Sequence, residues 1–170
     1  MAAGQFAFGE NYVQEAIAKQ ALLEDCNIEW HFIGHLQSNK VKYIAPFVSL
    51  IHSVDSLKLL QEINKQATKN NRVIDCLLQI YIAEEDTKSG MSEEECLEIL
   101  KTETLEKLPN VRIVGLMGMT TLTDDEAQIR KEFKKLCEFF KELRPQKADR
   151  SEFSTLSMGM SRSEEHTSEL

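Results

Sequence analysis

Two apolar stretches decide the fold: IDCLLQIYI at residues 74–82 and VRIVGLMGM at residues 111–119. Both are almost continuously apolar and contain several β-branched residues. A strand with one face in water would alternate between apolar and polar residues, whereas a strand covered on both faces does not need to. The two stretches are therefore predicted to be neighbouring strands of a buried parallel sheet.

Shorter strands are predicted at residues 5–8, 29–33, 49–53 and 152–156. Between the predicted strands lie longer segments whose apolar residues recur at helical spacing. Alternating strands and helices are typical of βα units. The predicted fold class is α/β, either a small open sheet or a (β/α)₈ TIM barrel. The chain has 170 residues, which is short for a complete barrel of about 250 residues.

Capping residues mark the predicted helix starts. Asn11 stands three residues before Gln14, and Ser92 stands three residues before Glu95, so both can cap a helix. The segment 123–126 (TDDE) fits a capping box. The core-facing residues are predicted to be Leu57, Leu60, Ile63 and Ala67 in a helix at 56–69, and Ile129, Phe133, Leu136, Phe140 and Leu143 after the capping box.

Charge and composition narrow the classes of function. The chain has 20 Lys and Arg against 28 Asp and Glu, a formal net charge of −8, which argues against a nucleic-acid partner. No apolar run approaches the roughly 20 residues that cross a bilayer, and the first residues do not resemble a signal peptide. We therefore expect a cytoplasmic protein without a membrane partner. The four cysteines, Cys26, Cys76, Cys96 and Cys137, form no C-x-x-C pair and are predicted to be buried free thiols.

Both ends of the chain carry unusual sequence. Residues 1–4 (MAAG) resemble the last turn of a helix, so sequence upstream of Met1 is expected to be missing. Residues 162–170 (RSEEHTSEL) show no apolar periodicity and resemble a translated sequencing adapter. We expect one domain at residues 1–161 and a non-native tail at residues 162–170.

Two polar segments follow predicted strands, on the side of a parallel sheet where ligands bind. In FGENYVQE, Asn11 offers an amide, although an N-cap role explains it equally well. In WHFIGHLQSNK, His31 and His35 lie four residues apart, but Gly34 and the strand pattern argue against a helical metal pair. His31 fits better as a hydrogen-bonded core histidine. Lys40 supplies an amine capable of imine chemistry, although a lysine in a first helical turn is usually just solvated.

Two further segments complete the candidates. The acidic run at residues 84–86 fits a solvated loop, and we assign it no catalytic role. In TLSMGMS, a strand is predicted to end in a loop where Ser157, Ser161 and the backbone around Gly159 hold a phosphate. Nucleotide-binding glycine motifs, a hydrolase elbow and a zinc-protease motif are absent from the sequence.

Five motifs in this order, FGENYVQE, WHFIGHLQSNK, QIYIAEEDTKSG, VRIVGLMGMTT and TLSMGMS, resemble the pyridoxal phosphate homeostasis protein family. This family is related to the N-terminal barrel of alanine racemase, and the resemblance covers residues 2–161. It implies a (β/α)₈ barrel of the alanine racemase N-terminal type that lacks its first and last strands here. It also implies pyridoxal 5'-phosphate (PLP) as the cofactor, in a homeostasis or carrier protein with no established catalysis.

The resemblance also implies particular roles for residues. The implied cofactor-binding residues are Asn11, His31, Ser157, Met158, Gly159 and Ser161, with no catalytic residue and no metal. In the family a lysine in an A-V-S-K-like first strand forms the Schiff base, and an R-I-G-T-like last strand binds the phosphate. Neither segment is present in this sequence. The chain is therefore expected to be an inactive fragment that folds marginally and associates through open sheet edges. The resemblance allows PLP-dependent apo-enzymes as recipients of the cofactor.

Two alternative functions remain open at this stage. The first is the barrel domain of a PLP-dependent amino-acid racemase or decarboxylase, an enzyme class that usually carries an additional β-rich domain. The second is a phosphate-binding aldolase barrel that uses Lys40 as its imine-forming amine. A longer reading frame with a β-rich domain would favour the first alternative, and loss of borohydride trapping in Lys40→Ala would favour the second.

Overall fold

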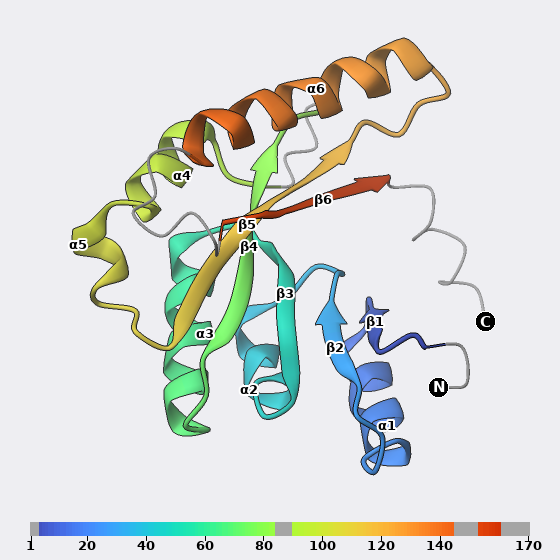
Figure 1. Ribbon diagram of the computed structural model, residues 1–170, viewed down its shortest axis with the longest axis vertical. Coiled ribbons are helices and arrows are strands. Elements are labelled where there is room, and N and C mark those ends of the chain that lie inside the picture. Colours follow the sequence, from blue (N-terminus) through green and yellow to red (C-terminus); the bar gives the residue numbers. More distant parts are fainter. Residues whose placement is uncertain (1–3, 84–89, 145–152, 161–170) are drawn as a thin grey trace.

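One parallel sheet forms the centre of the protein. The computed structural model describes residues 4–83, 90–144 and 153–160. Its six strands follow one another in the order of the chain, each hydrogen-bonded to the next (Figure 1). The strands are β1 (Ala7–Glu10), β2 (Glu29–Phe32), β3 (Val48–Val54), β4 (Ile74–Tyr81), β5 (Val111–Thr120) and β6 (Thr155–Met160).

Helices connect the strands, as the βα pattern predicts. They are α1 (Val13–Leu22), η1 (Ser38–Lys40), α2 (Val41–Ile44), α3 (Leu57–Lys69), α4 (Glu93–Ile99), α5 (Thr102–Leu105) and α6 (Glu126–Leu143). Sequential strand order with every described pair parallel is the arrangement of a (β/α) barrel rather than of a doubly wound sheet. A closed barrel of this class has eight strands, so the six described strands form an incomplete (β/α) barrel.

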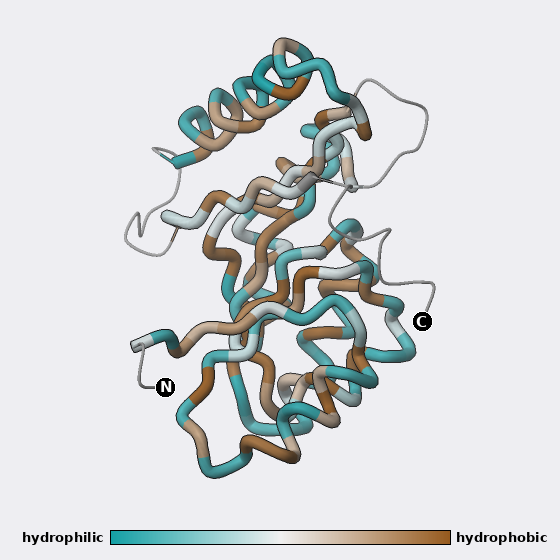
Figure 2. The backbone as a smooth tube through the Cα atoms, turned by 90° about the vertical axis from the view of Figure 1, so that its right-hand side faces the viewer, coloured by the Kyte–Doolittle hydropathy of each residue, from teal (hydrophilic) through white to brown (hydrophobic). Residues whose placement is uncertain are grey.

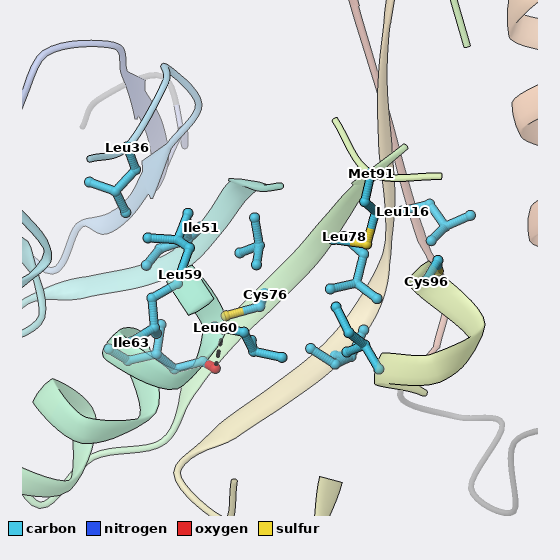
Figure 3. Packing of buried hydrophobic residues seen from close by; sticks show 14 of the residues in the cluster. Leu36, Ile51, Leu59, Leu60, Ile63, Cys76, Leu78, Met91, Cys96 and Leu116 are labelled. Carbon is cyan, nitrogen blue, oxygen red and sulfur yellow. Dashed lines mark hydrogen bonds between the residues drawn. The ribbon is translucent and has the colours of Figure 1, made fainter. Parts of the chain in front are cut away.

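The two faces of the sheet carry different cores. The large cluster packs strand residues such as Ile51 and Leu78 against helix residues such as Leu60 and Cys96 (Figure 3). A small second cluster contains strand residues alone: Leu50, Leu77, Val114 and Met117, with Met119 packed against them. The tube in Figure 2 shows the corresponding pattern, with mixed colours along α6 and longer hydrophobic stretches in the strands. The second cluster therefore marks the inner face of the incomplete barrel.

The two long predicted strands are confirmed to within one residue by β4 and β5. The shorter strands are placed less accurately, and two start later than predicted. Strand β1 begins at Ala7, because its register is set by pairing with Glu29 in β2. The segment at residues 155–160 is the strand β6 itself, paired along its whole length with β5. The prediction that the strand ends at Leu156 and a loop follows is therefore wrong for residues 157–160, whereas phosphate binding by these residues stays a prediction; Ser161 lies outside the described residues.

Helix starts were predicted with mixed success. Ser92 forms the predicted capping box with Glu95, in which each side chain bonds the other's backbone N–H. Helix α1 is capped by Tyr12, which gives no side-chain hydrogen bond, so the prediction that Asn11 caps this helix is wrong. The cap of α6 is Asp125, not the first residue of the predicted capping box. The sequence pattern of a capping box begins at Thr123, but the N-cap of the helix is two residues further along the chain.

The predicted core faces are mostly confirmed. Leu60, Ile63 and Ala67 of α3, and Leu136, Phe140 and Leu143 of α6, are buried. Leu57 is 39% exposed because the entry into α3 turns it toward solvent, and Leu59 is buried in addition. All four cysteines are free. Cys76 and Cys96 are buried as predicted, whereas Cys26 and Cys137 are only half-buried, and burial raises the pKa of the Cys76 thiol. Among the residues that the structure describes, no helix is both long and apolar enough to cross a membrane.

Candidate functional site

Three polar side chains are joined by hydrogen bonds across the inner face of the sheet. The Nδ1 atom of His52 lies 2.9 Å from the Oγ atom of Ser157, and its Nε2 atom lies 3.2 Å from Nδ1 of His31. These residues come from β3, β6 and β2. Ser157 is in register with Met117, a member of the inner cluster, and successive side chains of a strand alternate between faces. The three groups therefore lie with the apolar inner cluster rather than with the helices.

Burial keeps both histidines neutral near pH 7. It lowers the pKa of His52 from 6.5 to about 4, with a smaller contribution from the neighbouring His31. The pKa of His31 is also lowered by burial, partly opposed by the negative charge of Glu29. A neutral imidazole carries one donor and one acceptor nitrogen, so His52 can bond both neighbours at once. The hydrogen-bonded set His31–His52–Ser157 therefore consists of three neutral groups near pH 7.

The carboxyl ends of β1, β2 and β3 are tied together beside this set. The backbone N–H of Ile33 donates to the carbonyl of Glu10 at 2.9 Å. The buried hydroxyl of Ser53 donates to the carbonyl of Gly34 at 2.5 Å. A Cβ atom on Gly34 would collide with the backbone of Asn11. Glycine is therefore required here because two strand ends approach too closely for any side chain.

Asn11 places an unsatisfied polar atom at this edge. Its Oδ1 atom is buried and has no hydrogen-bond partner among the described residues. Buried acceptors without partners are rare in folded proteins because each costs about 1–3 kcal/mol. The position follows β1, at the edge of a (β/α) sheet where ligands bind. A ligand that donates an N–H or O–H to Asn11 would satisfy this atom.

The end of β5 is held by a buried carboxylate. Glu132 of α6 accepts from the backbone N–H of Thr121 at 2.8 Å and from its hydroxyl at 2.7 Å. The side-chain amide of Gln128 donates to the same carboxylate at 3.2 Å. Glu132 is thereby satisfied and fixes the turn from β5 into α6. Its role is structural, although the neighbouring Thr120 has a buried hydroxyl with no described partner.

The opposite edge of the inner face is hollowed. A hollow of about 460 Å³ is lined by residues at the starts of the strands, among them Glu29, Ser49, Asp75 and Arg112. The guanidinium of Arg112 bonds both carboxylate oxygens of Asp75, at 2.7 and 2.9 Å. His31 also lines this hollow. One end of the hydrogen-bonded set therefore faces the open hollow, and the other end, Ser157, lies in β6.

The predicted site residues are only partly brought together. His31 and Ser157 share the set on the inner face through His52, while Asn11 lies at the carboxyl edge. Gly159 is in β6 opposite Met119, and the side chain of Met158 is 46% exposed. Met158 is in register with Gly118, which faces Ile82 and Leu136 of the outer core, so the Met158 side chain is on the other face from Ser157.

Other candidates are separate from this set. Lys40 lies in η1, with its amine 5.9 Å from the ring centroid of Tyr43. His35 is exposed at 72% of its side chain and lies 3.8 Å from Asp55. No group of three His, Cys, Asp or Glu side chains that could hold a metal ion is found among the described residues. His31 is hydrogen-bonded to His52, whereas His35 lies beside Asp55, so the two rings have different neighbours.

His52 and Ser53 were missed by sequence reasoning. His52 stands in the predicted strand at 49–53, two residues after Leu50, and so shares its face in a regular strand. The alternation of the predicted strand could have shown that His52 shares a face with the apolar Leu50. The sequence could not show which residue His52 bonds, because Ser157 is 105 positions away along the chain.

The chain matches one family model and several curated proteins. The family model "Alanine racemase, N-terminal domain" matches residues 1–165. A pyridoxal phosphate homeostasis protein of Aquifex aeolicus is 44% identical over 158 residues, covering 93% of this chain and 68% of that protein. One from Haemophilus influenzae is 41% identical over 160 residues, covering 93% of this chain and 66% of that protein. The chain thus spans about two thirds of the length of these curated relatives.

Solved structures agree with this placement. PipY of Synechococcus elongatus with PLP bound is 38% identical, with a TM-score of 0.78 over 94% of this chain and 73% of that chain. An alanine racemase of Clostridium difficile shares the fold, with a TM-score of 0.65 at 17% identity over 94% of this chain and 40% of that chain. The family-model match over residues 1–165 and the 44% identity to the Aquifex aeolicus relative identify the family. The chain belongs to the alanine racemase N-terminal domain family and, within it, to the pyridoxal phosphate homeostasis proteins.

Proposed function

We propose that this chain is part of a protein that holds pyridoxal 5'-phosphate for cellular homeostasis rather than using it in catalysis. Because the Schiff-base lysine of the resemblance is absent from this sequence, the residues present would bind the cofactor without a covalent bond. The PLP-bound relative PipY, at 38% identity over 94% of this chain, supports the ligand. The names of the curated relatives support the homeostasis role. Within this chain, the observation that carries the proposal is the buried, unpartnered Oδ1 atom of Asn11 at the carboxyl edge of the sheet.

The residues proposed to hold the cofactor are those implied by the resemblance: Asn11, His31, Ser157, Met158, Gly159 and Ser161. Met158 would contribute through its backbone, because its side chain is on the other face of the sheet from Ser157. Asn11 would accept a hydrogen bond through Oδ1, and the Ser157 hydroxyl would donate to a ligand oxygen. His31 would act through His52, to which it is hydrogen-bonded. When bound, PLP supplies an aldehyde that captures amines reversibly and a phosphate that anchors it.

The organisation of the chain and its partners complete the proposal. Residues 1–161 form the cofactor-binding domain, and residues 162–170 form a non-native tail. PLP-dependent apo-enzymes are the proposed recipients of the cofactor, in the cytoplasm. The acidic balance of the chain, −8 in formal charge, supports small-molecule and protein partners over nucleic acid.

A titration of the full chain with PLP tests the proposed function. Fluorescence of Trp30, the single tryptophan, and absorbance of the cofactor report binding. We expect saturable binding that Asn11→Ala weakens about tenfold, the effect of losing one hydrogen bond to a buried partner. Asn27→Ala is the matched control, because Asn27 is exposed in the loop before β2.

Borohydride reduction and peptide mapping then identify any lysine that captures the aldehyde. Capture at Lys40 would favour the imine chemistry of the aldolase alternative, since Lys40 lies in η1 apart from the proposed site. Absence of saturable binding by the full chain, or equal affinities for Asn11→Ala and Asn27→Ala, would contradict the proposal.

A further inference from the structure

The set His31–His52–Ser157 has a property beyond holding a ligand: its hydrogen bonds run in series. His52 is the middle member and uses both ring nitrogens, Nδ1 toward Ser157 and Nε2 toward His31. The members come from three strands: His31 is 21 positions from His52 in the sequence, and His52 is 105 positions from Ser157. No local turn or cap requires such an arrangement. The fold therefore holds three proton-exchanging groups in one line across its inner face.

Neutral imidazoles permit only two consistent proton arrangements in this line. In the first, the Ser157 hydroxyl donates to Nδ1 of His52, Nε2–H of His52 donates to Nδ1 of His31, and His31 carries its proton on Nε2. In the second, every donor is reversed: Nδ1–H of His31 donates to His52, Nδ1–H of His52 donates to Ser157, and the hydroxyl is free to donate outward. Both histidines therefore always carry their proton on the same type of nitrogen.

The two arrangements differ by one proton passed along the line. A ligand group gives its proton to Oγ of Ser157 while the hydroxyl proton moves to Nδ1 of His52. The Nε2 proton of His52 moves to Nδ1 of His31, and the Nε2 proton of His31 moves to water. Each residue ends neutral, the ligand gains one negative charge, and the water gains the proton. The reverse sequence restores the first arrangement.

The surroundings suit such a transfer. His31 lines the hollow, so its ring is reachable by water, whereas His52 does not line it. The charged groups lining the hollow are Glu29 on β2, Asp75 on β4 and Arg112 on β5, the last two paired with each other. Glu29 is therefore the charge that favours a proton at His31, as its effect on the His31 pKa shows. Burial keeps both rings neutral, which a line of neutral carriers requires.

We propose that His31, His52 and Ser157 form a proton relay that exchanges one proton between a ligand at Ser157 and water in the hollow. The inference rests on the proposed function for the identity of the ligand, PLP. Because the second arrangement leaves the Ser157 hydroxyl free to donate, it matches a ligand that carries an anionic oxygen. Binding drives a proton outward through His31, and release returns it. His52 is the positioning residue and the carrier at the centre of the relay.

Nitrogen-15 NMR of the histidine rings in the full chain tests the relay without reliance on binding. The chain has four histidines, and His35→Gln, a change at an exposed ring outside the relay, assists assignment without altering it. Without ligand, we expect His31 and His52 to carry their protons on the same type of nitrogen. Protons on different nitrogens of the two rings would overturn the relay, whether or not PLP binds.

The second arm adds PLP. We expect both rings to move from the Nε2–H to the Nδ1–H form at saturation. Unchanged forms at saturating PLP would overturn the relay while leaving the proposed function intact. Absence of binding would refute the proposed function alone, because the ligand-free arm still decides whether the line exists.

Replacement of the central ring separates transfer from positioning. His52→Gln keeps a side chain that can hydrogen-bond Ser157 or His31 but cannot pass a proton through. In the parent protein, we expect D₂O to slow PLP binding and release, because a proton moves in each. In His52→Gln, we expect both rates to fall at least tenfold and the slowing in D₂O to disappear, and a titration reports any loss of affinity separately. A variant with wild-type rates and the same D₂O slowing would contradict the relay. Ser157→Ala, a change at a half-buried position that leaves both rings in place, serves as a second variant and should also abolish the ligand-induced change at His31.

Discussion

Acidification should lower the free energy of unfolding through His52, at pH values above those at which the carboxylates of the protein titrate. In the folded state, burial lowers the pKa of His52 from 6.5 to about 4. As the pH falls, the unfolded chain therefore takes up a proton at His52 near pH 6.5, whereas the folded chain does so only near pH 4. Stability from this group is complete above pH 6.5 and declines as the pH falls toward 4, because the unfolded state binds more protons in that window.

The size of the effect follows from the two pKa values. Between about pH 7.5 and about pH 5, linkage gives a loss of about 2 kcal/mol in the free energy of unfolding from His52 alone. His31, whose pKa is lowered in the same direction, adds to it. Few carboxylates with ordinary pKa values titrate above about pH 5, so the histidines dominate this range.

Urea unfolding followed by Trp30 fluorescence measures this loss. Trp30 is 6% exposed in β2, so its emission shifts when the sheet opens. His52→Gln is compared with the parent at both pH values, because the substitution changes absolute stability as well. We expect the pH-dependent loss to shrink by most of the His52 contribution in the variant. An equal loss in both proteins would refute the reasoning, since the burial of a neutral His52 would then not be the cause.

Further substitutions probe the sheet edge and the helix ends. Gly34→Ala should lower the free energy of unfolding by about 1–3 kcal/mol in urea melts, through collision with the Asn11 backbone, and an unchanged value would refute the close approach. Asn11→Ala should change stability by less than about 1 kcal/mol, because its Oδ1 has no described partner to lose; a larger loss would indicate a structural role. Glu132→Gln should cost about 2–3 kcal/mol, since an amide cannot accept all the bonds from Thr121 and Gln128, and a neutral result would remove Glu132 from the β5 anchor. Ser92→Ala should cost about 1 kcal/mol by thermal unfolding, unless the capping box does not hold in solution.

The strands were predictable where hydrophobicity alone decides them. IDCLLQIYI and VRIVGLMGM are buried on both faces, so their composition marks them regardless of their neighbours. TLSMGM carries polar and small residues, and pairing with β5 makes it a strand. The strand was predicted to end at Leu156 and a loop to follow, because local patterns do not show pairing with a strand that is distant in the sequence. The same limit explains the wrong cap at Asn11, where contact with Gly34 sets the backbone.

The candidate site was predictable in part for a related reason. His31 and Asn11 stand in motifs dense in polar groups at strand ends, which local sequence shows. His52 stands alone in a strand, and its significance arises only when the sheet brings β2, β3 and β6 to one inner face. The pairing register of the strands, which local composition does not show, brings the three residues of the relay together.

Satisfaction of hydrogen bonds separates structural from ligand-directed polar groups in this fold. Glu132 is fully buried, yet its carboxylate accepts three bonds from its own protein, so nothing is left for a ligand to supply. Asn11 is half-buried at the carboxyl edge of the sheet, but its Oδ1 atom is buried and unsatisfied among the described residues. Ser157 is intermediate: it is satisfied by His52 in either proton arrangement, and in one of them its hydroxyl proton is free. A ligand that carries both a donor for Asn11 and an anionic oxygen for Ser157 would satisfy both groups, and PLP, with its ring hydroxyl and phosphate, offers that combination.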